Sequence, residues 1–361
     1  MATVFFTGFP GFLGRELLPR ILERGDHNAV CLVQAAYMEQ AERVRAELVE
    51  QHGLAGRIKL VVGDITEGDL GLGERYEEIA GDTIEVFHLA AVYDVAVERE
   101  LAMRVNVTGT KNIIRFCASC PSLRRHQYVS TCFVSGRYDG SFTENDLEKG
   151  QAFNNFYEET KFLAELEVRR SMDRIPTTIY RPAIVVGDSA TGETSKYDGP
   201  YYVIRYMLKQ PTRLVLVPLL GDPSRSRMNV VPRNFVIDAI AHLSGLLKST
   251  GKTYALADPS PLTIADLMNA LERETGKVLI RIPTPMKLAK AAIDHVPGLQ
   301  TLLGFSSSAA EYFVHPTDYD TTQMLADLEG TGIEVPNFDK YIGHLVDYVS
   351  AHPEVPSAAM V

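Results

Sequence analysis

A glycine-rich turn near the start of the chain constrains the fold more than any other feature of the sequence. An apolar run, Val4–Phe6, precedes the turn, and a helical pattern begins at Arg15. This order of strand, glycine turn and helix is typical of phosphate binding, because a helix N-terminus offers free N–H groups and glycine lets a pyrophosphate approach the backbone. The spacing is GxxGxxG rather than GxGxxG, so a purely structural turn is the alternative. The turn consists of Thr7, Gly8, Phe9, Pro10, Gly11, Phe12, Leu13 and Gly14.

Length and composition exclude several classes of protein. With 361 residues, the chain is long for one core, which favours a large domain with a smaller second lobe. The net charge of −10 argues against a nucleic-acid partner, since backbone phosphates are bound by clustered Lys and Arg. No apolar run reaches the length of a membrane span. The first strand begins close to Met1 and leaves no room for a signal peptide, so we expect a cytoplasmic protein.

The cysteines predict no metal site. Cys117 and Cys120 form a CxxC at the end of a predicted helix, but no second pair stands at zinc-site spacing. We expect structural thiols there. The remaining cysteines are Cys31 and Cys132.

Apolar strand patterns alternate with helical patterns over the first half of the chain. Such alternation indicates crossover units and a parallel sheet covered on both faces. We therefore predict an α/β fold with a Rossmann-type doubly wound parallel sheet and a smaller, mainly helical C-terminal substrate lobe. The nucleotide-binding domain would span residues 1–186 and be completed by about 229–258, and the lobe would comprise 187–228 and 259–361. The expected strands are Val4–Thr7, Ala29–Val33, Ile58–Val62, Val86–Ala91, Gln127–Thr131, Thr177–Val186 and Thr253–Ala257. The expected helices are Arg15–Arg24, Met38–His52, Glu98–Cys120, Asn155–Met172, Tyr201–Lys209 and Asn234–Lys248.

A tyrosine and a lysine form the second strong feature. Asn155 and Glu158 have the spacing of a capping box, which predicts a helix start. Tyr157 and Lys161 lie four residues apart on that helix and share a face. A lysine cation favours the phenolate, so we expect it to lower the pKa of the tyrosine and make it a general acid or base.

A hydroxyl at the end of the preceding strand completes a possible catalytic set. A Tyr-x-x-x-Lys pair is common by chance, and an exposed helical pair is its ordinary alternative. Thr131, however, ends the strand before this helix and could hydrogen-bond a substrate carbonyl oxygen. Ser130 is the fallback for this role, and a plain strand-end hydroxyl is the alternative for both. We predict Thr131, Tyr157 and Lys161 as the catalytic residues.

Taken together, these motifs resemble the extended short-chain dehydrogenase/reductase superfamily over roughly residues 1–260. The resemblance implies that Asp64 and Ile65 lie at the adenine ring and that Lys161 holds the nicotinamide ribose. It implies that Asn106 orders the active-site helix, although Asn106 could equally satisfy backbone groups. The other implied cofactor contacts, at the pyrophosphate and ribose and at the nicotinamide amide, are Leu89, Ala90, Ala91, Pro182, Ala183 and Val185.

Within this superfamily the chain is most similar to fatty acyl reductases and thioester reductase domains. The cues are Gly11–Gly14, Val61–Thr66, Phe87–Asp94 and Val129–Thr131. The resemblance implies an NAD(P)H-dependent enzyme of lipid metabolism that reduces an acyl thioester, aldehyde or ketone on an apolar substrate. The alternatives are a hydroxysteroid-like or other secondary alcohol dehydrogenase, a sugar-nucleotide epimerase or dehydratase, and a non-catalytic cofactor-sensing protein.

The cofactor prediction is NADP(H) rather than NAD(H). The second strand ends at Gln34. This residue supplies no cation for a 2′-phosphate, but it is also not the Asp or Glu that usually selects the free ribose of NAD. Arg43 and Arg15 could supply the cation instead. A solvated helix face is the ordinary alternative for both arginines.

The C-terminal region hints at the substrate. The amphipathic pieces between Ile282 and Phe305 could cover an apolar pocket, touch a membrane surface peripherally or pack on a core of their own, and we favour the core. The aromatic segment Tyr201–Met207 is a pocket wall or plain packing. Because the Tyr157 helix is a common dimer face in the related superfamily, a homodimer is possible.

Overall fold

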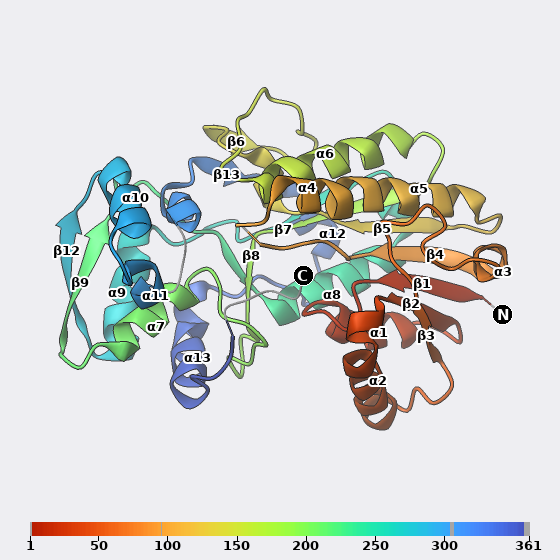
Figure 1. The fold of residues 1–361 in the computed structure, drawn as a ribbon, viewed down its shortest axis with the longest axis horizontal. Helices are drawn as coiled ribbons and strands as arrows, with labels where there is room; N and C mark the ends of the chain where they lie inside the picture. The colour runs from red at the N-terminus through yellow and green to blue at the C-terminus, as the bar shows by residue number, and fades with distance from the viewer. Residues whose placement is uncertain (1, 95, 304–306, 357–361) are drawn as a thin grey trace.

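The fold is built around a parallel sheet, as seen in a computed structural model that describes residues 2–94, 96–303 and 307–356. The seven strands have the order β11-β7-β5-β4-β1-β2-β3 (Figure 1). All neighbouring pairs in this sheet are parallel, which confirms the predicted doubly wound α/β class. The strands are β1 (Thr3–Thr7), β2 (Asn28–Val33), β3 (Ile58–Val62), β4 (Thr83–His88), β5 (Arg125–Val129), β7 (Thr177–Pro182) and β11 (Thr253–Leu256).

Helices cover both faces of this sheet. Figure 1 shows one layer above the strands and another below. The upper layer holds α4 (Arg99–Ala102), α5 (Thr110–Ser119) and α6 (Phe156–Ser171), and α3 (Arg75–Asp82) packs on α5. The lower layer holds α1 (Gly14–Leu22), α2 (Met38–His52) and α8 (Arg233–Gly245). Because both faces are covered, the inner strands are buried on both sides, and this explains their continuous apolar runs.

The strand order indicates where a ligand would bind. The chain runs from β1 outward to β2 and β3, then returns to β4 on the other side of β1. The carboxyl ends of β1 and β4 therefore flank the switch point, where ligands of open parallel sheets bind. The glycine-rich turn, the end of β5 and the start of α6 all lie at this edge.

Two elements predicted as continuous are broken. The helix expected at 98–120 contains a π-helical segment, Met103–Gly109, between α4 and α5. The strand expected at 177–186 ends at Pro182, and residues 184–186 form β8 (Ile184–Val186), which leaves the main sheet to pair with β10 (Val230–Pro232). Such departures from regular structure are common next to functional sites.

The lobe contains more strand than we expected. The sequence predicted no strand between residues 187 and 252, but β9 (Leu214–Leu219) pairs in parallel with β12 (Val278–Pro283). A strand with so distant a partner gives only a weak local signal. The helices around this pair are α7 (Tyr201–Lys209), α9 (Ile264–Thr275), α10 (Met286–His295), α11 (Leu299–Leu303) and α13 (Phe338–Ala351).

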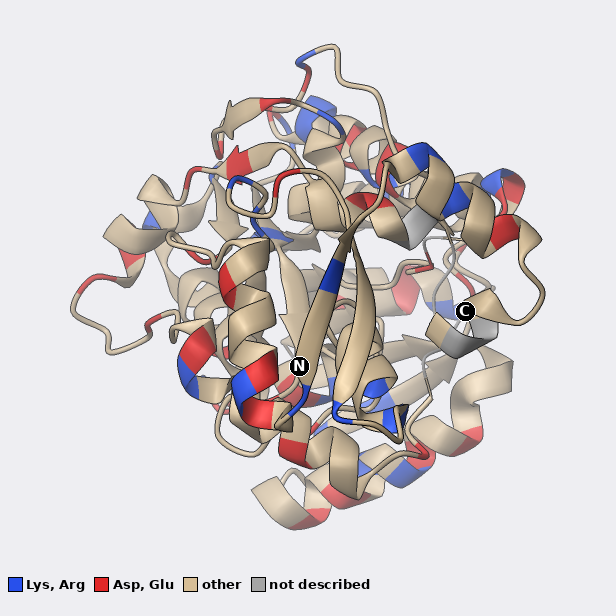
Figure 2. Ribbon diagram, turned by 90° about the vertical axis from the view of Figure 1, so that its left-hand side faces the viewer, with Lys and Arg blue, Asp and Glu red and all other residues tan. Residues whose placement is uncertain are grey.

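This strand pair leaves apolar side chains exposed. β9 carries no charged residue and β12 carries one, and Figure 2 shows two largely uncharged strands facing the viewer between helices of mixed charge. Leu214, Leu216, Val278, Ile280 and Ile282 are exposed on it.

The segment around 282–305 packs on a core of its own, although Gly304 and Phe305 lie outside the described residues. Ala289 and Ile293 of α10 are buried with Leu220 and Ala310. Among the described residues, no helix combines the length and the apolarity that crossing a membrane requires.

One C-terminal helix packs against the main sheet and α8 rather than on the lobe. Met324 and Leu328 of α12 (Thr322–Leu328) join the core under β11 and α8. In the same region Asp327 forms ion pairs with Lys248 and Lys252. The tail therefore crosses back to the sheet before α13 returns to the lobe.

A buried ion pair fixes α6 against the sheet. Arg181 on β7 contacts Glu165 on α6 at 2.6 Å, and Ser130 donates to the same carboxylate at 2.7 Å. Burial opposes ionisation of Glu165, but the charge and hydrogen bonds of Arg181, with help from Arg169, hold its pKa below the ordinary value. The carboxylate thus links three elements at the carboxyl edge.

We predict that Glu165→Ala lowers the free energy of unfolding by about 3–5 kcal/mol, because it leaves the buried Arg181 guanidinium without its counter-ion. Urea denaturation at pH 7 measures this change. Glu167→Ala is the matched control on the same helix, since its pairs with Lys111 and Arg170 are solvent-exposed and worth about 1 kcal/mol or less. Equal losses in the two variants would contradict the role given to the buried pair.

Candidate active site

A cavity of about 820 Å³ lies at the switch point of the sheet. It is bounded by the glycine turn, the carboxyl ends of β4 and β5, the first turn of α6 and the β7–β8 segment. Most of the residues predicted from the sequence line it. They are Thr7, Gly8, Gly11, Phe12, Leu13, Gly14, Gln34, Asp64, Ile65, Leu89, Ala90, Ala91, Thr131, Tyr157, Lys161, Pro182, Ala183 and Val185.

The glycine turn has the geometry of a phosphate cradle. Gly8 adopts a φ of +90°, and a Cβ there would lie 2.8 Å from the Leu89 Cβ and 2.9 Å from the Ala90 nitrogen. A Cβ on Gly14 would collide with the carbonyl oxygen of Gly8. The turn closes through the Gly11 N–H, which donates to that oxygen at 2.9 Å. Only glycine fits at both ends, so the residues present suit a dinucleotide, whose pyrophosphate the start of α1 would hold.

A hydrogen-bonded chain that sequence reasoning missed supports this turn. The Thr7 hydroxyl lies 2.8 Å from His88 Nδ1 and accepts from the Ala90 N–H at 3.3 Å. The other ring nitrogen of His88 lies 3.1 Å from the Thr110 hydroxyl. Burial lowers the pKa of His88 well below its usual value, so the ring is neutral. His88 precedes Leu89 and so was part of a quoted motif, but nothing in its spacing indicated these partners.

At the end of the cavity where the resemblance places the adenine ring, Gln34 donates to Asp64 at 3.0 Å, and Asp64 also accepts from the Thr66 N–H at 2.8 Å. Arg43 does not reach this site: its side chain is 68% exposed and pairs with Glu39 on its own helix. Arg43 thus lies on a solvated helix face, which was the alternative to the cofactor contact expected from the sequence.

Arg15, which directly follows the glycine turn, lines the cavity. Its guanidinium lies 3.4 Å from Glu16 and 3.6 Å from Glu47, and its Nε has no hydrogen bond within the described part of the chain. The cavity therefore has a cation next to the glycine turn. Arg104 also lines it, from the π-helical segment.

Asn106 is buried behind the cavity rather than on its wall. Its side chain accepts from the Val92 N–H at 2.9 Å and donates to the Thr160 hydroxyl on α6 at 3.0 Å. It therefore satisfies backbone groups of the β4 loop and contacts the active-site helix as well. The π-helical segment gives Asn106 this position between the two.

Tyr157 sits at the wall of the cavity and is only 5% exposed. Its helix begins as predicted, because the Asn155 side chain accepts from the Glu158 N–H at 3.0 Å. The second half of the expected capping box differs, since the Glu158 carboxylate accepts from the N–H of Asn154 and not from that of Asn155. Burial raises the pKa of Tyr157 above its usual value, and a hydrogen bond with Thr131 partly offsets this. The phenol is therefore protonated at neutral pH.

Lys161 does not lower the pKa of Tyr157 in the way the sequence predicted. Its ammonium donates to the Val129 carbonyl at 2.9 Å and to the Tyr128 hydroxyl at 3.1 Å. Burial lowers the pKa of Lys161 to about 8, with Glu165 acting in the opposite direction. Desolvation of the buried phenol outweighs the expected lysine effect, a balance that helical spacing does not reveal.

The side of the cavity opposite the glycine turn is aromatic and charged. The Tyr93 ring meets the Tyr157 ring edge-on, with centroids 5.0 Å apart. The Lys196 ammonium lies 3.8 Å from the centroid of the Tyr93 ring and 2.6 Å from Asp198. Sequence analysis missed Lys196 and Asp198, because their loop carries no motif.

No group of three or more metal-ligating side chains comes together among the described residues. The cysteines are free and buried, and burial raises the pKa of Cys120 to about 12. The Cys120 thiol donates to the Phe116 carbonyl at 3.1 Å.

Comparison with known proteins agrees with this geometry. The family model described as "Male sterility protein" matches residues 6–240. The chain belongs to this family. It is an extended short-chain dehydrogenase/reductase.

The similar proteins are mostly larger. A non-canonical nonribosomal peptide synthetase, FrzA from Cladobotryum sp, is 30% identical over 74% of this chain and 27% of its own length. A linear gramicidin synthase protein from Brevibacillus parabrevis is 29% identical over 74% of this chain and 5% of its own length. Aldehyde reductase lnbA from Aspergillus flavus is 26% identical over 95% of this chain and 34% of its own length. The chain thus spans about a third or less of these relatives.

Solved structures share the whole fold. The terminal R domain of the myxalamid PKS-NRPS biosynthetic pathway superposes with a TM-score of 0.84, at 24% identity, over 99% of this chain and 92% of that one. The R domain of a nonribosomal peptide synthetase from Mycobacterium tuberculosis has a TM-score of 0.74, at 21% identity, over 98% of this chain and 92% of that one.

We predict that Gly8→Ala weakens NADPH binding at least about tenfold, the factor that a misfit of about 1.4 kcal/mol produces. The new Cβ would meet backbone atoms of the 89–90 segment, which cannot rotate away. Fluorescence titration of NADPH measures the change. Gly53→Ala is the matched control, since Gly53 has a φ of +66° but open space around it. If Gly8→Ala binds as tightly as Gly53→Ala, the turn does not hold the pyrophosphate.

Proposed function

We propose that this protein reduces an acyl thioester, or the corresponding aldehyde, with NADPH. The observation that carries the proposal is the convergence of Thr131, Tyr157 and Lys161 on the same cavity as the glycine turn. The names of the similar proteins support a thioester or aldehyde as substrate, because they include peptide synthetases and aldehyde reductases.

The cofactor fits the residues that line this cavity. A bound NADPH supplies hydride to the substrate carbonyl carbon. We infer that residues 1–186, completed by 229–258, form the nucleotide-binding side, and that 187–228 and 259–361 cover the substrate side. Pro182, Ala183 and Val185 border the cavity between the two.

Each catalytic side chain then has a distinct role. The Thr131 hydroxyl holds the carbonyl oxygen and keeps it within reach of the phenol. Tyr157 donates its proton to that oxygen as negative charge develops, a role that suits a phenol kept neutral by burial. Lys161 places a positive charge beside the Val129 carbonyl and the Tyr128 hydroxyl, which keeps the end of β5 in place. With a thioester, the product of these steps is a hemithioacetal, which collapses to an aldehyde and a free thiol.

NADP(H) is the preferred cofactor in this proposal. Gln34 follows β2 directly and is not itself a carboxylate of the kind that selects the free ribose of NAD, and its amide donates to the nearby Asp64 carboxylate. Of the two arginines expected from the sequence, Arg15 is the one that lines the cavity, and we assign the 2′-phosphate to its guanidinium, which would exchange its ion pairs with Glu16 and Glu47 for the phosphate.

We predict that Tyr157→Phe lowers kcat by about 10²–10⁴-fold, the usual contribution of a general acid, and leaves the dissociation constant of NADPH within about twofold. NADPH oxidation with octanoyl-CoA or octanal measures the first, and fluorescence titration the second. Tyr206→Phe is the matched control, because its hydroxyl contacts the Leu216 carbonyl in the lobe.

Two outcomes would overturn the proposed function. A Tyr157→Phe variant that keeps full turnover would show that the phenol is not the proton donor. A wild-type protein that oxidises NADPH only with a 3-ketosteroid, and not with octanoyl-CoA or octanal, would assign it to secondary alcohol chemistry instead.

We predict that Arg15→Ala raises the KM for NADPH about tenfold and the KM for NADH less than about twofold, because only the 2′-phosphate needs this cation. Arg43→Ala is the control and should change neither value. Steady-state kinetics with both cofactors measure the difference. An equal rise for NADPH and NADH would show that Arg15 does not read the 2′-phosphate.

A further inference from the structure

The strand pair of β9 and β12 presents an apolar face to solvent. Its register places three pairs of outward side chains next to each other, and all six residues are exposed. The pairs are Leu214 with Val278, Leu216 with Ile280, and Pro218 with Ile282. Strand alternation turns the residues between them inward, where Val215, Val217 and Leu279 join the core of the lobe. The six outward residues therefore form one continuous apolar surface, which we call the β9–β12 face.

The β9–β12 face is too exposed to be ordinary protein surface. Leu214 and Leu216 are 57% and 55% exposed, and Ile280 and Ile282 are 42% and 46% exposed. A single exposed apolar residue needs no explanation, but contiguous ones mark a binding surface. Each strand also has a free edge, because the sheet that they form has two strands within the described part of the chain. Exposed apolar strands tend to aggregate unless something covers them, so we infer that this face has a partner.

A cluster of cations lies at the edge where both strands begin. Arg213 directly precedes β9 and Lys277 directly precedes β12, and the two are neighbours because the strands are parallel and in register. Lys209 ends α7, on the segment that leads into β9. The Lys277 ammonium donates to the backbone carbonyls of Gln210 and Thr212 at 2.6 Å and 3.0 Å, which holds this segment against the start of β12.

These three cations have no counter-ion. No carboxylate lies within ion-pair distance of them among the described residues, and those of the preceding helix are already paired, Glu272 with Arg281 and Glu274 with Arg273. Residues 199–221 and 275–293 together carry seven cations and no Asp or Glu, in a chain whose net charge is −10. The part of the lobe around the β9–β12 face is therefore positive, against the charge of the whole chain, and complements an anionic partner.

The composition of the face favours a lipid surface over a protein. Its outward side chains are all aliphatic, whereas interfaces between proteins are enriched in aromatic residues, Met and Arg. An anionic lipid surface suits both features, because it accepts aliphatic side chains and its head groups attract nearby Lys and Arg. A second copy of the chain would cover the apolar residues, but the same face on that copy would bring no anion to the cations.

We propose that the β9–β12 face binds the surface of an anionic membrane. The aliphatic side chains lie at the level of the lipid head groups, and Lys209, Arg213 and Lys277 contact the lipid phosphates. The free backbone groups along the edges of both strands cannot enter hydrocarbon, so the contact is peripheral. This inference goes beyond the proposed function and does not rest on it.

Sedimentation of the full chain with lipid vesicles tests the inference. The vesicles are phosphatidylcholine alone, or phosphatidylcholine with phosphatidylserine at about 3:1. Arg213→Gln removes one cation, and Leu216→Ser with Ile280→Ser removes two side chains from the face. Lys59→Gln is the matched control for charge, since Lys59 is exposed on β3, at the other end of the molecule (Figure 1). Leu247→Ser is the matched control for the face, because Leu247 is 89% exposed on a different segment.

We expect the wild type to bind the mixed vesicles at least about tenfold more tightly than the neutral ones, because the cations are attracted to anionic lipid. Arg213→Gln should weaken binding to the mixed vesicles about fivefold, the factor for one cation at such a surface. The double variant should weaken it at least about tenfold through lost apolar burial. Both controls should stay within about twofold of the wild type. Thermal denaturation checks that every variant folds.

Three results would overturn the inference. The first is a wild type that does not bind the mixed vesicles. The second is an equal loss in Arg213→Gln and Lys59→Gln, which would show that net charge and not this cluster attracts the protein. The third is a wild-type dimer in gel filtration that the double variant converts to a monomer, which would assign the face to a second copy. None of these measurements uses NADPH oxidation, so their outcome is separate from that of the proposed function.

Discussion

The active-site helix α6 is held by buried polar contacts, and the rest of the site depends on them. Glu165 binds Arg181 on β7, Thr160 binds Asn106, and Lys161 binds the end of β5. These contacts fix the orientation of α6 about its own axis, because any other orientation would leave buried charges and hydroxyls unpaired. Tyr157 and Thr131 meet at the cavity as a result.

The glycine turn is held in place in the same way as α6, by buried polar contacts and close packing. The Gly8 backbone packs so closely on the segment after β4 that no Cβ fits on residue 8. The hydrogen bonds of His88 with Thr7 and Thr110 hold these segments together. The glycine turn and Tyr157 thus belong to one rigid edge of the sheet, as the proposed hydride transfer requires, because it needs two partners held close together.

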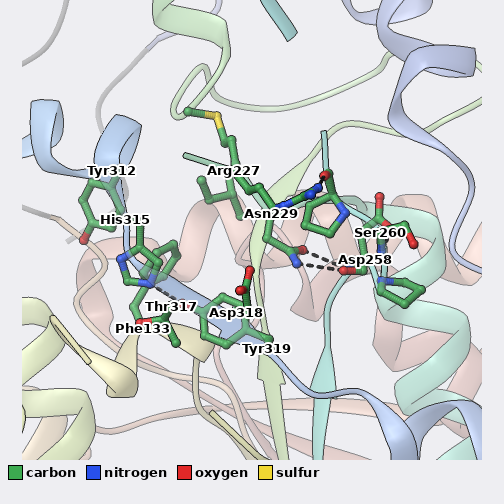
Figure 3. Close-up of a pocket in the computed structure, with 14 residues that line it drawn as sticks. Phe133, Arg227, Asn229, Asp258, Ser260, Tyr312, His315, Thr317, Asp318 and Tyr319 are labelled. Carbon is green, nitrogen blue, oxygen red and sulfur yellow. Dashed lines mark hydrogen bonds between the residues drawn. The ribbon is translucent and has the colours of Figure 1, made fainter. Parts of the chain in front are cut away.

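The lobe borders this edge of the sheet. Phe133 lies between the catalytic cavity and a second cavity of about 450 Å³, and its ring contacts those of Tyr312 and His315 (Figure 3). Segments far apart in the sequence therefore set the shape of the catalytic cavity on this side.

The sequence by itself determined the features that depend on neighbouring residues. The helices at 38–52 and 201–209, the glycine turn, and the Tyr157–Lys161 spacing follow from dihedral preferences and helical periodicity. Only the tertiary structure decided the pairing of β9 with β12, the exposure of Arg43, the His88 chain and the direction of the Tyr157 pKa shift. These depend on burial and on contacts between distant segments, and desolvation is set by whatever surrounds a group in space rather than by its neighbours in the chain.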